Sequence, residues 1–266
     1  RRSGDAGAAA RSVRRRGWEI FGLAFLFRLQ SYLLNPGATI DGLLKVDILN
    51  VMGPTIVLSA MLWQLGRARP ARIAILAGAT VAIAMATPLV RTWSVVAALP
   101  DFIEAYVRPL PGLSNFAFFP WSGFVSSGAV AGLVVAAAWR AGRLGAAAIG
   151  LGGAGVALAV TGYALSFQPM LYPDSRFWTT SPTFFLLRTG VLTAGLAVSY
   201  AWSARPWRHG WSPMVDLGRN SLFVYWIHVE MVYGVLATPL RRALSLEQVL
   251  VGIVAMCILM ILAIRL

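Results

Sequence analysis

Long apolar runs, separated by short polar or basic segments, dominate the hydrophobic pattern of this chain. Each run is long enough to cross a bilayer, which takes roughly 20 apolar residues. The backbone of a lipid-exposed segment must satisfy its own hydrogen bonds, so each run is predicted to be helical. The pattern predicts an all-α, polytopic transmembrane helix bundle, a single domain over residues 1–266 with about eight membrane helices. The predicted spans are 17–35, 46–65, 72–90, 117–139, 144–166, 183–203, 218–238 and 248–266.

The composition agrees with this fold class. Hydrophobic residues make up 58% of the 266 residues and charged residues only 12%, with a mean hydropathy of +0.70. A soluble domain would carry about 25% charged residues. The ten-residue alternation of transmembrane strands is not seen. The one cysteine, Cys257, lies inside an apolar run and has no partner for an intrachain disulfide.

The net charge of +13 would indicate nucleic acid in a soluble protein, but here the basic residues lie mostly between the apolar runs. We therefore expect a lipid bilayer and no nucleic acid as partner. Cytoplasmic loops of membrane proteins are enriched in Lys and Arg, which predicts a cytoplasmic start for this chain. Arg241 and Arg242 do not fit this rule, because they lie in a loop that is predicted to be on the outer side. The alternate, basic loops contain Arg1, Arg2, Arg11, Arg14, Arg15 and Arg16, then Arg67, Arg69 and Arg72, then Arg140 and Arg143, then Arg205 and Arg208.

Two predicted outer loops, 91–116 and 167–182, are rich in aromatic residues and proline. They are interpreted either as an aromatic belt at the membrane interface or as a lid over a site that opens outward. A third feature is the set of small residues in the span 144–166. Gly150, Gly152, Gly153 and Gly155 favour close contact with a neighbouring helix.

Polar residues at bilayer depth are costly, so each is a candidate for function. Arg28 is predicted near the midplane, either paired with a buried acid or binding substrate. Asp47 and Asn50, three residues apart at the start of a span, share one helix face. Asp47 is a candidate general base or substrate ligand, or a solvated acid that the helix dipole favours.

The span around residues 217–234 has the densest polar pattern. Ser221, Tyr225 and His228 lie at spacings of four and three residues, which places them on one stripe, whereas Glu230 lies on another face. His228 is interpreted as a proton-transfer group or as an interhelical hydrogen-bond partner. The basic loop with Arg205 and Arg208 could meet a phosphorylated cofactor or lipid headgroups.

Four stretches, in order, resemble the membrane acyltransferases related to heparan-α-glucosaminide N-acetyltransferase, in particular their bacterial members. They are the basic lead into a helix ending at Asn35-Pro36, then KVDILNVMG, then FFPWSGFVSSGAVAG with Trp121, and then LGRNSLFVYWIH. In the last stretch Asn220, Tyr225 and His228 match the family's Asn, Tyr and His. The resemblance covers most of the chain.

The resemblance implies transfer of an acyl group from cytoplasmic acyl-CoA, most simply acetyl-CoA, to a small-molecule or glycan acceptor on the outer side of a bacterial inner membrane. It further implies one or two upstream helices, with the principal catalytic His there, so His228 and Asp47 are only candidates. No metal cofactor is expected, and a homodimer is compatible with the family. The expected acceptor ligands are Arg28, Asn50, Trp121, Asn220 and Tyr225, and the expected CoA ligands are Arg14, Arg15, Arg16, Arg205, Arg208 and Arg219.

A transporter or lipid-handling protein without covalent chemistry is the alternative. It would use the same polar helix faces as a passage through the membrane. The sequence shows no internal inverted repeat, which favours the acyltransferase hypothesis.

Overall fold

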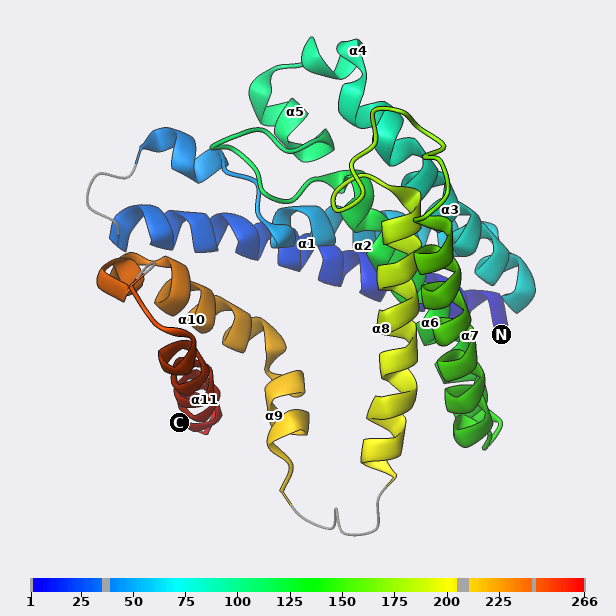
Figure 1. The fold of residues 1–266 in the computed structure, drawn as a ribbon. Helices are drawn as coiled ribbons and strands as arrows, with labels where there is room; N and C mark the ends of the chain where they lie inside the picture. Colours follow the sequence, from blue (N-terminus) through cyan, green and yellow to red (C-terminus); the bar gives the residue numbers. More distant parts are fainter. Residues whose placement is uncertain (1, 35–38, 205–210, 241–242, 266) are drawn as a thin grey trace. The chain divides into compact units, whose positions relative to one another are not determined.

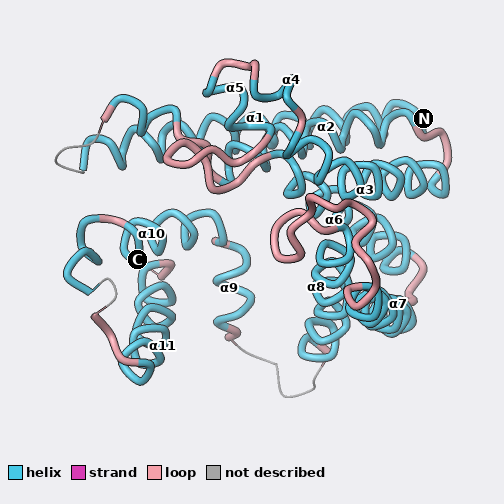
Figure 2. The backbone as a smooth tube through the Cα atoms, turned by 45° about the horizontal axis from the view of Figure 1, so that its top comes forward, coloured by secondary structure: helices cyan, strands magenta, loops and turns pink. Residues whose placement is uncertain are grey.

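The computed structural model describes residues 2–34, 39–204, 211–240 and 243–265. Within these ranges the chain forms α-helices and short 3₁₀ helices but no strand (Figures 1 and 2). The predicted all-α class is confirmed.

Six of the described helices are long and apolar enough to cross a membrane. Each coincides within a few residues with one predicted span, which supports an integral membrane protein. They are α2 (Ile48–Leu65), α3 (Arg69–Thr92), α6 (Phe118–Arg140), α7 (Leu144–Leu165), α8 (Pro182–Ser203) and α11 (Leu246–Ala263).

The prediction of eight spans is wrong, since the described residues contain six. Residues 17–34 of the predicted span 17–35 lie within α1 (Arg2–Leu34), a helix whose apolar stretch is interrupted by Glu19, Arg28 and Gln30. The predicted span 218–238 is broken into α9 (Pro213–Arg219), α10 (Ser221–Tyr233) and the 3₁₀ helix η3 (Val235–Leu240). The 13 residues of α10 extend only about 20 Å at 1.5 Å per residue, short of a 30 Å hydrocarbon core.

The chain divides into two compact units. The first consists of residues 1–25 and 44–203, and so holds most of α1 and five of the six long helices. The second consists of residues 26–43 and 204–266, and holds the end of α1, α9, α10, η3 and α11. The single acyltransferase-like domain stays a prediction.

Glycines allow α7 and α8 of the first unit to pack with their backbones in contact. A Cβ atom on Gly155 would meet the backbone nitrogen of Ala194, and one on Gly190 would lie 2.6 Å from the carbonyl oxygen of Gly155. The predicted close contact is therefore confirmed for Gly155. Gly150 and Gly153 have nothing within 4 Å of their Cβ positions and face away from this contact.

The segment between α3 and α6 is packed rather than open. It contains α4 (Ser94–Ala97) and α5 (Asp101–Val107). Ala105 joins Val46 and Val51 in a buried apolar cluster, and the amide of Val46 donates to the carbonyl of Leu113 at 2.7 Å. These contacts hold the segment against the start of α2.

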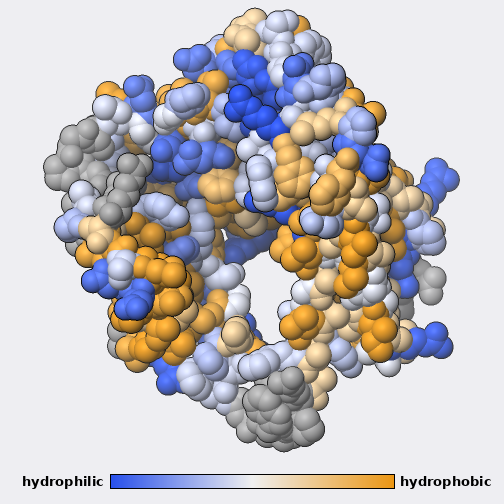
Figure 3. Space-filling model, viewed as in Figure 1, coloured by the Kyte–Doolittle hydropathy of each residue, from blue (hydrophilic) through white to orange (hydrophobic). Residues whose placement is uncertain are grey.

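Apolar side chains cover the outer surfaces of the long helices. Ile149 on α7 and Val198 on α8 are 78% and 71% exposed, and Figure 3 shows apolar side chains spread over these two helices. In the second unit, α11 exposes Val251 to 69%. Exposed apolar surface of this extent is unusual for a soluble protein and suits contact with lipid.

Candidate functional site

A pocket of about 390 Å³ lies in the first unit where α3, α6 and α8 adjoin the two predicted outer loops. We call it the arginine pocket because it contains two arginine side chains and no acidic one. It is lined by Ala84, Arg91, Pro109, Ser114, Asn115, Pro120, Trp121, Phe124, Trp178, Thr179, Thr180, Ser181, Phe184, Phe185 and Arg188. Both aromatic-rich loops thus contribute to its wall, which favours their interpretation as the cover of a site.

Arg91 is anchored at the end of α3 by neighbouring backbone. Its Nη2 donates to the carbonyl of Phe119 at 3.1 Å, and its own carbonyl accepts from Arg108 Nη1 at 2.9 Å. Arg108 is in turn held by Glu104, whose Oε1 accepts from Arg108 Nε at 2.6 Å in a largely buried ion pair. The Nε of Arg91 is buried and has no hydrogen-bond partner among the described residues. One donor of a fixed guanidinium is therefore unused.

Arg188 lies about 9 Å into α8, six residues after its first residue at 1.5 Å per residue. Its guanidinium lies 4.2 Å from the ring centroid of Phe184, a cation–π contact that leaves its hydrogen-bond donors available. No carboxylate lies within ion-pair distance of Arg91 or Arg188 in the described parts of the chain. The pocket thus has two positive charges without a counter-ion from its own wall.

Aromatic side chains form much of the remaining wall. The Trp121 ring lies 4.9 Å from that of Phe116 and 5.8 Å from that of Phe124, measured between centroids. Trp178 lies 5.1 Å from Phe184 and is 71% exposed. Planar rings beside arginine donors suit a ligand with a ring face and an anionic group. Trp121, predicted to bind the acceptor, lies where such a ligand would contact it.

Asp47 and Asn50 form a capping box at the start of α2. The Asp47 carboxylate accepts from the amide of Ile48 at 2.7 Å, and the Asn50 side chain accepts from the amide of Asp47 at 2.9 Å. Asp47 is 7% exposed, so it is not the solvated acid of the alternative hypothesis. The Asn50 amide donates to the Tyr106 hydroxyl at 3.3 Å; burial raises the pKa of Tyr106, and this hydrogen bond acts in the opposite direction. Both predicted site residues thus have local structural partners.

In the second unit, a polar cluster joins the end of α1 to α10. Trp226 Nε1 donates to Gln30 Oε1 at 2.5 Å, and Arg28 lies within electrostatic range of Glu230. One carboxylate oxygen of Glu230 is buried without a hydrogen-bond partner in the described ranges. Trp226 and Glu230 are four residues apart and share a helix face. The Arg28–Glu230 proximity favours the hypothesis that Arg28 is paired with a buried acid.

The predicted stripe of Ser221, Tyr225 and His228 lies on a different part of the α10 surface from Trp226 and Glu230. Tyr225 contacts Phe27, with ring centroids 6.2 Å apart, and its ring lies 6.0 Å from that of His228. His228 Nδ1 is 3.2 Å from the carbonyl of Val224 in its own helix. Ser221 is exposed. His228 is half-buried, and its catalytic role stays a prediction.

Asn220 lies at the junction of α9 and α10, where its side-chain amide donates to the carbonyl of Asp216 at 3.0 Å. Its own carbonyl accepts from the amide of Val224 at 2.9 Å. Asn220 is exposed and fixes the break between the two helices. Arg219, at the end of α9, is also exposed.

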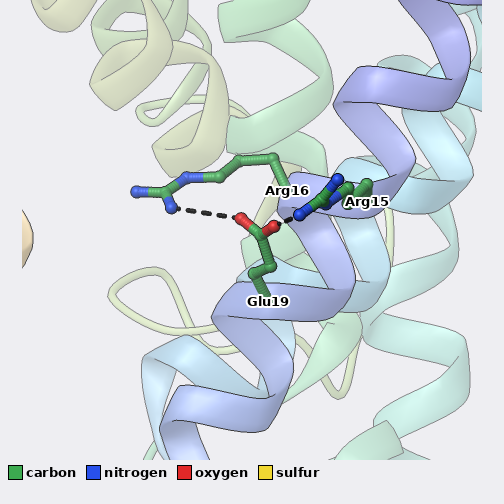
Figure 4. Close-up of polar contacts among 3 residues, drawn as sticks. All are labelled: Arg15, Arg16 and Glu19. Carbon is green, nitrogen blue, oxygen red and sulfur yellow. Dashed lines mark hydrogen bonds and ion pairs between the residues drawn. The ribbon is translucent and has the colours of Figure 1, made fainter.

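The basic residues at the start of α1 are partly neutralised. Glu19 accepts from Arg15 Nε at 2.9 Å and from Arg16 Nη1 at 3.3 Å, on an exposed helix face (Figure 4). Exposed pairs of this kind are weak and would yield to a stronger anion. Arg14 is half-buried on the same helix. Arg205 and Arg208, predicted to bind the same cofactor, lie outside the described residues.

The hydropathy pattern does not single out the two arginines of the pocket. Arg91 falls at the first position of a predicted outer loop, and Arg188 lies within a predicted span. The rule that selected Arg28, a charge inside an apolar run, applies equally to Arg188. No signal in the sequence indicated that both side chains would meet in one pocket.

No group of three His, Cys, Asp or Glu side chains in the described ranges could hold a metal ion. Comparison of the chain with protein-family models, curated proteins and solved structures gives no match. The geometry and the resemblance stated above are therefore the basis for a functional proposal.

Proposed function

We propose that this chain is a membrane acyltransferase whose acceptor binds in the arginine pocket. The observation that carries the proposal is the pair of arginines, Arg91 and Arg188, in a pocket without a carboxylate. A charged side chain inside a membrane protein normally pairs with an opposite charge. In this pocket, the ligand itself would supply that charge.

The aromatic residues support an acceptor rather than a simple inorganic ion. Trp121 and Trp178 offer flat apolar surface beside the two guanidinium groups, which suits a phosphorylated or carboxylated sugar. The wall has no acid or histidine to deprotonate a hydroxyl nucleophile. The general base of the proposed reaction comes from outside the residues that line the pocket, and Asp47 is the candidate from the first unit.

The donor half of the proposal rests on the family resemblance and on the basic residues of the predicted cytoplasmic side. Acyl-CoA carries phosphates that arginines bind as charge-assisted hydrogen-bond donors. Arg14, Arg15 and Arg16 would provide this attraction, together with Arg205, Arg208 and Arg219. This assignment requires α1 to cross the membrane in addition to the six long helices, so that Arg14, Arg15 and Arg16 lie on the cytoplasmic side. The proposed location is the bacterial inner membrane.

Binding of acyl-CoA tests whether this protein uses acyl-CoA as its acyl donor. In the full protein, reconstituted in phosphatidylcholine nanodiscs, acetyl-CoA should bind measurably by calorimetry. Replacing Arg14, Arg15 and Arg16 together by Gln should weaken binding by about tenfold, because each exposed charge pair contributes up to about 1 kcal/mol. The loss should be larger at low ionic strength, where solvated charges are less screened.

Arg176→Gln is the control for this measurement, since Arg176 lies on the predicted outer side and should leave acyl-CoA binding unchanged. Absence of binding for acetyl-CoA and for longer acyl-CoAs would overturn the acyltransferase proposal and leave the lipid-handling alternative.

The short α10 bears on membrane topology. If α10 does not cross the bilayer, residues 211–245 all lie on the side where α8 ends, which is the predicted cytoplasmic side. By sequence position, Arg241 and Arg242 then fall on the basic side and cease to be an exception to the positive-inside rule. The two arginines themselves lie outside the described residues.

Cysteine labelling in a Cys257→Ser background tests this topology. Met214→Cys in α9 and Leu244→Cys before α11 should both react with an impermeant maleimide only after the membrane is opened, because no crossing separates them. Ile40→Cys, predicted to be outside, should react in intact cells. Reaction of Leu244→Cys but not Met214→Cys in intact cells would show that α10 crosses after all.

A lipid-handling or transport role without covalent chemistry is the second candidate. One observation favours it: an apolar cavity adjoins the arginine pocket.

A further inference from the structure

The apolar cavity has a volume of about 690 Å³ and lies among α3, α6, α7 and α8 of the first unit. Side chains such as Val81, Val130, Leu158 and Leu186 line it, and the loop after α7 closes part of one end. The volume is within the roughly 300–1,000 Å³ range of small-molecule sites. Its wall contains no charged side chain, so it suits a hydrocarbon group.

The cavity and the arginine pocket share three wall residues, Ala84, Ser181 and Phe185. Ala84 is 7% exposed and lies on α3, two turns before Arg91. The two spaces therefore adjoin directly, with a cationic, aromatic-lined compartment at the loop end and an apolar compartment between the helices. This polarity matches a molecule with one anionic end and one apolar end.

One hydroxyl in the cavity wall is unused. Hydroxyl side chains within apolar helices usually donate to the carbonyl four residues earlier. Thr80 donates in this way to Leu76 at 2.9 Å, and Thr193 donates to Thr189 at 2.7 Å. The Thr189 hydroxyl is buried but has no hydrogen-bond partner in the described residues. Because Thr189 follows Arg188 directly, this free donor lies near the cationic end.

We propose that the two compartments bind one amphiphile, with a phosphate-type anion at Arg91 and Arg188 and its hydrocarbon chain in the apolar cavity. The inference rests on the anion site of the proposed function and specifies its ligand class. The guanidinium groups bind the anion by charge-assisted hydrogen bonds. The Thr189 hydroxyl donates to the carbonyl oxygen of a carboxylic ester that joins the chain to the head.

A chain-length series of alkyl phosphates tests this inference. Methyl, butyl, hexyl and octyl phosphate are titrated into the full protein in phosphatidylcholine nanodiscs, with empty nanodiscs as the reference for partition into lipid. Each buried methylene should raise affinity by about threefold to fourfold beyond that reference. Octyl trimethylammonium, which has the same chain and the opposite charge, should not bind.

Ala131→Phe on α6 narrows the apolar cavity alone, because Ala131 lines the cavity and not the arginine pocket. The bulky ring should leave methyl phosphate affinity unchanged and reduce the gain with chain length. If the variant does not fold, Leu158→Trp on α7, at a second position that lines only the cavity, should reduce the gain in the same way. Thr189→Val should weaken an acyl glycerol phosphate several-fold but not an alkyl phosphate, which has no carboxylic ester carbonyl.

The outcomes distinguish the two proposals. If chain length has no effect in the wild type while Arg188→Gln weakens methyl phosphate, the pocket takes a free phosphate-type anion and the amphiphile inference is wrong. If Arg188→Gln leaves all phosphates unaffected, the anion site itself is wrong, and with it the acceptor site of the proposed function.

Discussion

Replacing Gly190 by Leu should separate α7 from α8 and lower the thermal stability of the protein substantially. At Gly190 an added Cβ would lie 2.6 Å from the carbonyl oxygen of Gly155 and 2.8 Å from the Cα of Ala159, both backbone atoms that no side-chain rotation can move. Overpacking of this kind costs about 1–3 kcal/mol and sometimes more. The higher helix propensity of Leu offsets only about 1 kcal/mol of it. Thermal unfolding in detergent would measure the loss.

Gly195→Leu is the matched control, because it makes the same change in the same helix at a position with nothing within 4 Å of the added Cβ. It should keep or slightly raise the midpoint. Gly190→Leu should also impair phosphate binding, since Gly190 directly follows Arg188 and Thr189 on α8. Equal midpoints for the two variants would mean that α7 and α8 do not pack through their glycines.

Hydropathy alone predicted six long helices of this fold to within a few residues. The runs that became α2, α3, α6, α7, α8 and α11 are uninterrupted and bounded by polar segments, so length and apolarity are sufficient. Hydropathy failed for the predicted span 218–238, because it does not detect the points at which a helix is interrupted. Asn220 ends α9 through its bond to Asp216, and Gly234 ends α10.

The arginine pocket could not be predicted from the same pattern. Arg188 and Trp121 belong to different helices, and a hydropathy pattern does not determine which helices pack together or which face they share. The glycines gave a partial clue, since Gly155 does mark the α7 surface that meets α8. Its partner Gly190 was visible in the sequence, but only the fold shows that the two lie opposite each other.

The emphasis on His228 illustrates a second limit. A polar stripe predicts that side chains share a face, not what that face contacts. Tyr225 and His228 do lie close together, yet Arg28 approaches Glu230, on the face that also contains Trp226. In the described part of the first unit, by contrast, Arg91 and Arg188 have no carboxylate within ion-pair distance.

We propose that Arg91 and Arg188 form a specific anion site rather than a generally basic surface. Replacing both by Gln removes two positive charges from the pocket. Each hydrogen bond to a charged group contributes about 1.5–3 kcal/mol, so the affinity for octyl phosphate should fall at least about 100-fold. Arg140→Gln with Arg143→Gln removes the same charge from the exposed junction of α6 and α7, outside the pocket.

The most direct test is therefore the dissociation constant for octyl phosphate, measured by calorimetry in phosphatidylcholine nanodiscs for the two double variants, with unfolding midpoints recorded for each. Arg91→Gln/Arg188→Gln should lose binding by two orders of magnitude, while Arg140→Gln/Arg143→Gln should bind as the wild type does. An equal loss in both folded variants would overturn the proposed anion site, because net charge rather than the arginine pocket would then attract the anion.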